Sequence, residues 1–397
     1  MGWPHCAGPA RPSGPRFPVV AGGQGKSRSA QHVVHTVSSR RDVDVVVIGA
    51  GQAGLSTGWA LARQGFEPGT GFVVLDADAA PGGAWQHRWP SLTLGTTHRV
   101  HDLPGLRFDP PADDTPAVAS VPAYFAEYER RFDLPVHRPV RVRAVRRTDD
   151  DGFRVETDTG DWTARAIVNA TGTWTRPFVP RYPGQELFRG RQLHTVDYRS
   201  ADEFAGQHVV VVGGGASATQ LLGEISQVAD TTWVTRRPPV WREGPFDEAV
   251  GREVVAKVAE AVREGRRPGS VVGLTGLLVS TPYIRDALDR GVLERLPTFD
   301  RITEDGVEWA DGRHVRADAI LWATGFRAAV QHLAPLHLRG AGGGIRMDGT
   351  AVAGEPRVHL VGYGPSASTI GANRAGQEAA RRLRRLLRDP GELPRTA

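Results

Sequence analysis

Two glycine-rich turns carry residues whose types and spacing suit the binding of a dinucleotide. The first, Gly49-Ala-Gly51-Gln-Ala-Gly54, follows the apolar run Val43–Ile48, and the second, Gly213-x-Gly215-x-x-Ala218, follows His208–Val212. The first glycine permits a tight bend, the second lets a pyrophosphate approach bare backbone, and the small third residue lets the next helix pack close to the strand. The N-terminus of that helix meets the charge of the phosphates. A chain with two such sites binds two dinucleotides, which indicates redox chemistry between them.

Charged residues end the second strand of each predicted unit. Asp76 follows Phe72–Leu75, where such units place an acid that accepts hydrogen bonds from a ribose; a plain loop aspartate is the alternative. The strand Thr231–Thr235 instead ends in Arg236 and Arg237, where an NAD site would have an acid. A guanidinium can bond a 2′-phosphate with two parallel N–H groups, so this pair favours NADPH. The alternative is that one of the two arginines merely faces solvent.

A third motif, Phe188-x-Gly190-x-x-x-His194-x-x-x-Tyr198, lies just before the second glycine turn. In this order, the three motifs resemble the class B flavin-dependent monooxygenases, which comprise flavin-containing, N-hydroxylating and Baeyer–Villiger enzymes. The resemblance runs from about Asp42 to Arg388. It implies an α/β fold with two Rossmann-like dinucleotide-binding domains. The FAD-binding domain would comprise residues 41–182 and 318–397, with an NADPH-binding domain of residues 183–317 inserted into it.

The resemblance also implies a reaction. FAD would bind at the first turn and NADPH at the second, and the reduced flavin would react with O2 to form a C4a-hydroperoxide that oxygenates a small organic substrate. Tyr198 stands where the Baeyer–Villiger fingerprint has tryptophan. Oxygenation of nitrogen or sulfur, or oxidative decarboxylation, is therefore favoured over ketone insertion. A flavin reductase that inserts no oxygen is the alternative, and a non-catalytic redox sensor is disfavoured because both turns are intact.

Further residues are expected at the cofactors because family motifs recur here. A G-G-x-W stretch would wrap the flavin, and an A-T-G turn would mark each crossing between the domains. The last helix, Ile370–Arg388, would direct the positive end of its dipole at the pyrimidine side of the flavin. The cofactor-binding residues predicted in this way are Gly83, Trp85, Thr171, Gly172, Thr324, Gly325 and Gly362.

Four residues are candidates for a catalytic role. Thr97 and His98 fall near the place where many relatives carry a polar residue beside the reactive edge of the flavin. A surface histidine is the alternative for His98. His194 and Tyr198 belong to the linker motif, and His194 either acts in catalysis or ties the two domains together.

Composition excludes several classes of protein. The single cysteine among 397 residues, Cys6, permits neither an intramolecular disulfide nor a dithiol mechanism. The basic residues are nearly all arginines dispersed along the chain, which indicates a compositional bias rather than a nucleic-acid surface.

No metal-ligand cluster stands out. No apolar run is long enough to span a bilayer, and residues 1–40 resemble a disordered leader without a signal-peptide pattern, so we expect a cytoplasmic protein. A homodimer remains possible.

Hydrophobic spacing predicts the remaining elements. Helices are expected at Val121–Phe132, Phe246–Gly265 and Pro282–Gly291. Val136–Arg146 is expected to form one half-exposed strand that makes a hairpin with Phe153–Thr157. A second short hairpin is expected from Gly306–Trp309 and His314–Val315.

Overall fold

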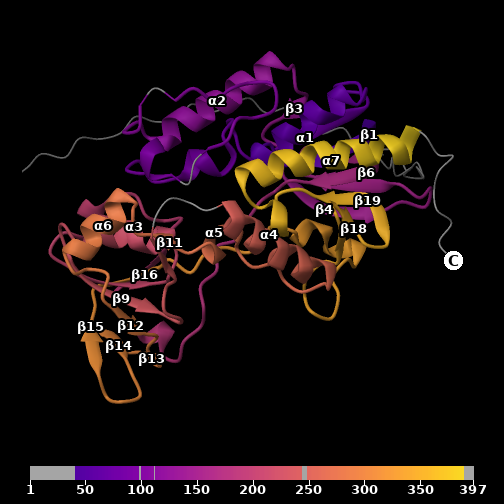
Figure 1. The fold of residues 1–397 in the computed structure, drawn as a ribbon. Coiled ribbons are helices and arrows are strands. Elements are labelled where there is room, and N and C mark those ends of the chain that lie inside the picture. The colour runs from indigo at the N-terminus through magenta and orange to yellow at the C-terminus, as the bar shows by residue number, and fades with distance from the viewer. Residues whose placement is uncertain (1–40, 98–99, 111, 244–247, 389–397) are drawn as a thin grey trace, which may run out of the picture. The chain divides into compact units, whose positions relative to one another are not determined.

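A computed structural model describes residues 41–97, 100–110, 112–243 and 248–388. The predicted leader, residues 1–40, lies outside this described part of the chain, and so does His98. Among the described residues, two larger sheets hold the dinucleotide motifs (Figure 1).

The first sheet is built around β1 (Arg41–Ile48), which pairs in parallel with β2 (Phe72–Leu75) and β6 (Trp162–Asn169). Val45, Val46 and Val47 are fully buried, as the continuous apolar run predicts for a parallel strand covered on both faces. The strands that extend this sheet are β3 (Val136–His137), β4 (Val142–Arg147), β5 (Phe153–Thr157), β17 (Met347–Asp348), β18 (Ala351–Val352) and β19 (Glu355–Leu360).

Helices α1 (Gln52–Arg63) and α7 (Thr369–Arg388) lie side by side against this sheet (Figure 1). Their close approach depends on small residues. A Cβ at Gly376 of α7 would lie 2.9 Å from the backbone nitrogen of Thr57 in α1. The predicted helix at 121–132 is also present, as α2 (Ala117–Arg131), and packs beside the G-G-x-W segment.

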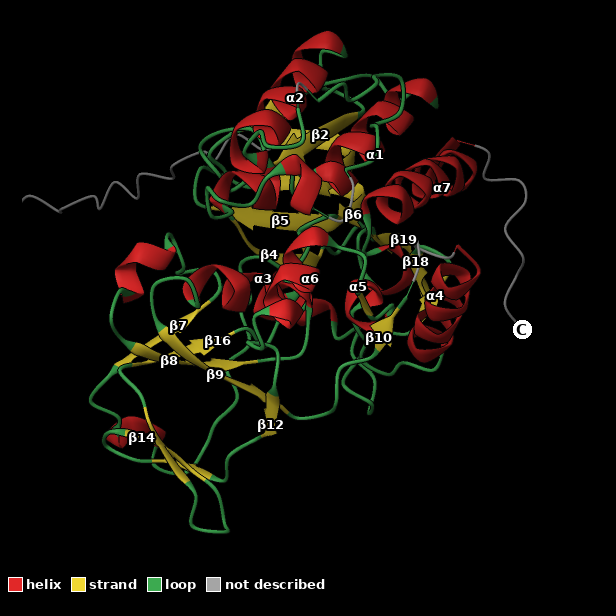
Figure 2. Cartoon of the chain, turned by 60° about the vertical axis from the view of Figure 1, so that its left-hand side comes forward, coloured by secondary structure: helices red, strands yellow, loops and turns green. Residues whose placement is uncertain are grey.

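The second sheet holds five parallel strands among the described residues, in the order β12-β9-β8-β16-β7 (Figure 2). These strands are β7 (Arg191–His194), β8 (His208–Val212), β9 (Asp230–Thr235), β12 (Arg295–Pro297) and β16 (Ala319–Trp322). Helices α3 (Ala216–Ile225) and α6 (Pro282–Asp289) pack against each other beside this sheet. The predicted second hairpin is confirmed by β14 (Gly306–Glu308) and β15 (His314–Arg316), with β13 (Arg301–Ile302) beside them.

Two segments lie elsewhere than the sequence suggests. β16 belongs to the second sheet, between β7 and β8, so the return to the first sheet falls after Trp322 rather than at residue 318. α4 (Glu248–Arg263), although inside the stretch 183–317, places Val262 in an apolar cluster with Ile345 and Met347 beside the first sheet. Two further buried valines of α4, Val254 and Val258, form a separate cluster with Val271. The remaining short elements are β10 (Trp241–Arg242), β11 (Leu277–Leu278) and α5 (Val271–Leu274).

The expected single strand at 136–146 is wrong, because the segment divides into β3 and β4. β3 pairs in parallel with β2, whereas β4 pairs antiparallel with β5. Pro139 has no N–H to donate to a ladder, and Arg138 turns inward to an ion pair with Asp76. The alternation of apolar and basic residues therefore spans two strands.

The chain passes between the two sheets along two neighbouring segments. Pro177 and Phe326 form an antiparallel bridge, and the N–H of Phe178 donates to the Gly325 carbonyl at 3.0 Å. Arg327 adds a bond from its N–H to the Arg176 carbonyl at 2.9 Å. The outgoing and returning segments are thus joined into a short ribbon. None of the described helices has the length and apolar content needed to cross a membrane.

Two histidines with lowered pKa values, one fully buried and one half-buried, are expected to make the fold sensitive to acid. His359 in β19 is fully buried, with Nδ1 2.9 Å from the Thr350 hydroxyl, and burial followed by the charge of Arg382 lowers its pKa to about 3. Asp348 and a backbone hydrogen bond oppose this shift. His332 bonds the Asn169 side chain at 2.6 Å, and burial lowers its pKa to about 4.

We predict that the free energy of unfolding decreases as the pH falls below about 6.5, the ordinary histidine value. In that range the unfolded chain takes up protons that the folded chain does not, at up to about 1.4 kcal/mol per pH unit for each histidine. His359→Gln, which can still bond Thr350, should show a shallower slope. Denaturant unfolding over this range measures the slope, and equal slopes for the variant and the wild type would contradict the assignment.

Candidate functional site

In the first glycine turn, Gly49 and Gly54 are required by packing. Gly49 has a φ of +100°, and a Cβ there would lie 2.7 Å from the Ala170 carbonyl oxygen. A Cβ at Gly54 would lie only 1.8 Å from the Gly49 carbonyl oxygen. Gly51 differs, because the nearest atom to its Cβ would be the Gly83 Cα at 3.9 Å. Its backbone therefore borders open space at the N-terminus of α1, as a pyrophosphate cradle requires.

The G-G-x-W segment closes over this turn. Gly83 opens the 3₁₀ helix η1 (Gly83–His87) with a φ of +52°, and a Cβ on it would lie 2.9 Å from the Gly51 Cα. Two stretches of bare backbone thus face each other. Trp85 of the same turn is half-buried and packs against the main core.

Asp76 lies at the end of β2, and its buried carboxylate bonds the backbone of Ala50 in the glycine turn. It also accepts a hydrogen bond from Arg138 Nε at 2.8 Å, and the Arg138 Nη1 atom lies 2.6 Å from Glu129. Burial raises the pKa of Asp76, although Arg138 opposes this shift. An acid thus lies at the predicted ribose position, held by an ion-pair network that the sequence did not reveal.

The second glycine turn repeats the construction of the first. Gly213 has a φ of +146°, and a Cβ on it would lie 2.2 Å from the Ala323 carbonyl oxygen. A Cβ at Gly215 would meet no described atom within 4 Å, and α3 begins at the next residue. Ala218, in the first turn of α3, is fully buried. A second bare-backbone cradle is therefore present at a helix N-terminus.

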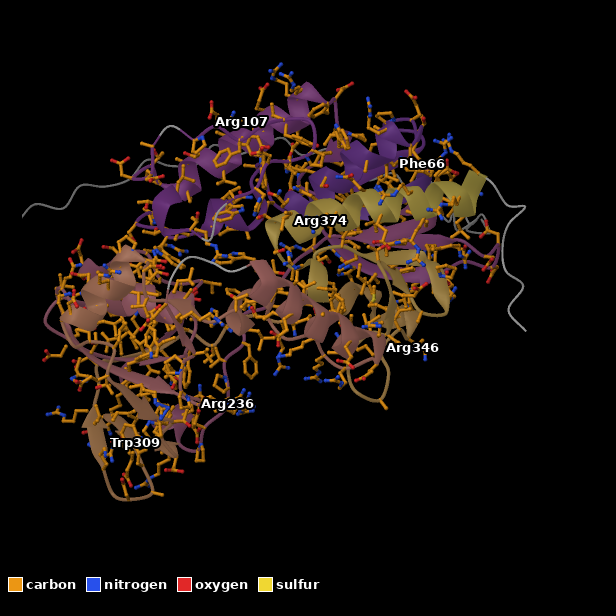
Figure 3. All side chains as sticks on the ribbon, in the orientation of Figure 1. Phe66, Arg107, Arg236, Trp309, Arg346 and Arg374 are labelled. Carbon is orange, nitrogen blue, oxygen red and sulfur yellow. The ribbon has the colours of Figure 1, made fainter. Side chains whose placement is uncertain are left out.

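Arg236 and Arg237 are exposed just after β9, and Figure 3 shows Arg236 on the surface. The Thr235 hydroxyl donates to the Arg237 carbonyl at 2.8 Å and accepts from Arg295 Nη1 at 3.3 Å. Sequence reasoning missed Arg295, because the pairing of β12 with β9 that brings it here joins distant parts of the chain. Three arginines therefore gather at the end of the second strand of this unit.

Each A-T-G turn is fixed by a hydrogen bond from its threonine to a distant segment of the chain. The Thr171 hydroxyl donates to the Ala329 carbonyl at 2.6 Å, and the Thr324 hydroxyl donates to the Phe178 carbonyl. Gly172 and Gly325 have φ angles of +58° and +78°. Both threonines therefore bind the backbone of the segments that cross between the sheets.

His194 lies between the second A-T-G turn and the linker. Its Nε2 is 3.0 Å from the Gly325 carbonyl, and its Nδ1 accepts from the Val196 N–H at 3.3 Å. Nε2 is therefore the donor nitrogen. Burial lowers the pKa of His194, so the ring is neutral at pH 7. Of its two predicted roles, this geometry matches the tie between domains.

Tyr198 is fully buried, and its hydroxyl donates to Glu224 Oε2 on α3 at 3.0 Å. The same carboxylate oxygen accepts from the Ser91 hydroxyl at 2.6 Å. Burial, together with the charge of Glu224, raises the pKa of Tyr198. Glu224 therefore joins the G-G-x-W region, the linker motif and the second dinucleotide unit, and sequence spacing alone gave no signal for it.

Two other predicted residues take part in local hydrogen bonds. The Thr97 hydroxyl donates to the Leu94 carbonyl at 2.8 Å, at the end of the 3₁₀ helix η2 (Leu94–Thr96). The Gly362 N–H donates to the Ser366 hydroxyl at 3.0 Å, and a Cβ on Gly362 would lie 3.4 Å from that of Ala53. Gly362 thus borders α1, as expected for a contact near the first dinucleotide.

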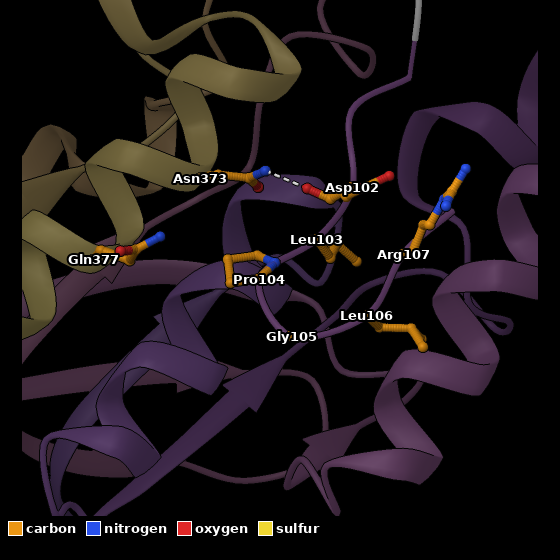
Figure 4. A pocket seen from close by; sticks show the side chains of 8 residues that line it. All are labelled: Asp102, Leu103, Pro104, Gly105, Leu106, Arg107, Asn373 and Gln377. Atoms are coloured by element: carbon orange, nitrogen blue, oxygen red, sulfur yellow. Dashed lines mark hydrogen bonds between the residues drawn. The ribbon is translucent and has the colours of Figure 1, made fainter. Parts of the chain in front are cut away.

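A polar network that sequence reasoning missed connects the first glycine turn to α7. Gln52 Nε2 donates to Asn373 Oδ1 at 3.0 Å and to the His101 carbonyl at 3.2 Å. Asn373 donates in turn to the Asp102 carbonyl at 2.6 Å (Figure 4). A pocket of about 460 Å³ lies beside this network, lined by Asp102–Arg107, Asn373 and Gln377. Among the described residues, no group of three or more His, Cys, Asp or Glu side chains is placed to hold a metal ion.

The chain belongs to the pyridine nucleotide-disulphide oxidoreductase family, whose model matches residues 46–271. A flavin monooxygenase from Stenotrophomonas maltophilia, solved as a double variant, is 40% identical, with 87% of this chain and 99% of that chain covered and a TM-score of 0.75. The uncharacterized oxidoreductase CzcO of Bacillus subtilis is 30% identical over 72% of this chain and 81% of its own length. The indole-3-pyruvate monooxygenase YUCCA1 of rice is 28% identical over 75% of this chain and 79% of its own.

These comparisons confirm the expected α/β class and the resemblance to class B flavin-dependent monooxygenases. The protein is a flavin-dependent oxidoreductase with FAD and NADPH as its cofactors. The family takes its name from disulphide chemistry, yet the single cysteine of this chain, Cys6, provides no dithiol.

Gly51 and Gly54 of the first turn should respond differently to substitution. Gly51→Val adds a side chain where the backbone borders open space, so the protein should fold without bound FAD. Gly54→Ala should lower the free energy of unfolding by about 1–3 kcal/mol or more, because its Cβ collides with backbone. Flavin absorbance per protein and the melting temperature, with FAD-stripped wild type as control, measure both effects. Full FAD occupancy in Gly51→Val would overturn this assignment.

Proposed function

We propose that the protein is an NADPH- and O2-dependent monooxygenase that oxygenates a small organic substrate. The observation that carries the proposal is the repeated construction of two bare-backbone cradles, at Gly51 and Gly215, each beside an A-T-G turn. We assign FAD to the first cradle and NADPH to the second. We assign the two cofactors to separate domains, with the boundary between them after Trp322.

The residues of the first cradle fit FAD. Gly51 and Gly83 would present backbone to a pyrophosphate, the N-terminus of α1 would face its charge, and Asp76 would accept a hydrogen bond from a ribose hydroxyl. When bound, FAD supplies the electron transfer and the reaction with oxygen, while the protein supplies position and exclusion of water. α7, bonded to Gln52 through Asn373, would direct its positive dipole end toward the pyrimidine side of the flavin, as the family resemblance implies.

The linker residues act as positioning groups in this proposal. His194 is neutral and bonded through both ring nitrogens, so it holds the second A-T-G turn against the linker rather than transferring a proton. Tyr198 and Ser91 both bond Glu224, which fixes α3 relative to the G-G-x-W region. The tyrosine at position 198 continues to favour oxygenation of nitrogen or sulfur, or oxidative decarboxylation, over ketone insertion.

The reaction of reduced protein with oxygen tests the proposal directly. A monooxygenase protects the product of its reduced flavin and oxygen from water, so after rapid mixing with O2 a transient absorbance distinct from both reduced and oxidised flavin should precede the oxidised spectrum, and hydrogen peroxide should appear only as this transient decays. A flavin reductase without oxygen insertion would pass from the reduced to the oxidised spectrum without such a transient. Free FAD reduced under the same conditions is the control. Immediate reoxidation with stoichiometric peroxide would favour the reductase alternative.

The cofactor preference tests the arginine cluster. Flavin reduction by NADPH should be about ten- to a hundred-fold more efficient than by NADH, because a hydrogen bond to a charged group contributes about 1.5–3 kcal/mol. An Arg236→Ala, Arg237→Ala double variant should lose most of this preference, and Arg295→Ala should lose part of it. Arg285→Ala, an exposed arginine on α6, is the matched control. Equal use of both nicotinamides by the wild type would refute the assignment.

A further inference from the structure

Arg88 is a largely buried cation that has no anionic partner among the described residues. Its guanidinium carbon lies 4.7 Å from the ring centroid of Trp174 and 5.9 Å from those of Trp85 and Trp89. We call these three residues the tryptophan cage. The Nε atom is enclosed and bonds no described atom, whereas the side chain keeps some exposure, which leaves its Nη end as the reachable edge.

The surroundings of Arg88 are unfavourable for an isolated charge. Burial lowers its pKa to about 10, and no carboxylate in the described part of the chain opposes this shift. The other well-buried arginine of this region, Arg138, is held by both Asp76 and Glu129. A buried guanidinium without a counter-ion costs stability, and the faces of aromatic rings replace only part of its hydration. The cage is therefore suited to receive an anion.

The tryptophan cage lies where the two predicted domains meet. Trp174 follows the first A-T-G turn and stacks on Phe326, which follows the second, with 5.3 Å between centroids. Phe326 in turn meets the ring of His194 edge-on at 5.0 Å. Trp89 contacts Tyr198 of the linker motif at 6.0 Å. Arg88 is thus connected through aromatic contacts to the residues that border both cradles.

We propose that Arg88 binds the carboxylate of an anionic organic substrate, and so determines the substrate class. This inference rests on the proposed monooxygenase function. The phosphates of the cofactors already have bare-backbone cradles, helix N-termini and the arginines after β9, whereas Arg88 is surrounded by flat apolar rings. A planar guanidinium edge can donate two parallel N–H groups to a carboxylate, and tryptophan faces suit the apolar body attached to it. The substrate class is therefore an aromatic carboxylic acid.

Binding of a matched pair of probes to the FAD-loaded protein tests the inference. The probes are 3-phenylpropionate and its neutral amide, 3-phenylpropionamide, and calorimetry or a shift in melting temperature reports their binding. The wild type should bind the acid at least about tenfold more tightly than the amide, as a charge-assisted hydrogen bond predicts. Arg88→Met should lose this preference while retaining FAD. It should also melt at a higher temperature than the wild type without ligand, because the unpaired charge is gone.

Arg143→Met, at an exposed position of β4, is the control and should keep the preference for the acid. If Arg88→Met fails to fold, Arg88→Gln removes the charge with less change in polarity and should show the same loss. Equal binding of acid and amide by the wild type, no binding of the acid, or an unchanged preference in the neutral variant would overturn the proposal. Loss of FAD from Arg88→Met would overturn it too, because Arg88 would then be a cofactor contact. Neither NADPH nor oxygen enters this test, so its failure is separable from failure of the proposed function.

Discussion

The contact between a strand-end carbonyl and a glycine fixes both halves of this molecule. Ala170 meets Gly49 in the first sheet, and Ala323 meets Gly213 in the second, each at a distance that no side chain could occupy. These contacts hold the glycine turns beside the A-T-G turns, and the following helices begin there. The cradles, the strand order and the position of the linker all depend on this spacing.

Sequence reasoning succeeded where local chemistry determines structure. A glycine that requires a positive φ and a continuous apolar strand are visible within a few residues, as Gly213 and Val45–Val47 show. It failed where the partner lies far along the chain. The ion pair of Arg138 with Asp76, the bond between Glu224 and Ser91, and the position of Arg295 beside β9 come from tertiary packing that no local pattern encodes.

For the candidate site, too, the sequence predicted local features and missed partners that lie far along the chain. The linker motif places His194 at the end of β7 and Tyr198 just after it, and no local pattern indicated that these side chains bond Gly325 and Glu224. Nothing in the local sequence distinguishes Arg88, because an arginine close to two tryptophans is compatible with an exposed loop. Its enclosure by aromatic rings depends on Trp174, which follows the first A-T-G turn and comes from a distant part of the chain.

Arg176–Phe178 and Gly325–Arg327 form a ribbon, which brings together the two ends of the segment 179–324. A segment whose first and last residues are neighbours can be inserted into a host, or removed from it, without separating the strands on either side. The segment between these ends could therefore be exchanged between related proteins, provided that the residues it meets beside the first sheet, Gly343 and Ile345, are exchanged with it. The junctions for such a chimaera lie at this ribbon rather than at the ends of the second sheet.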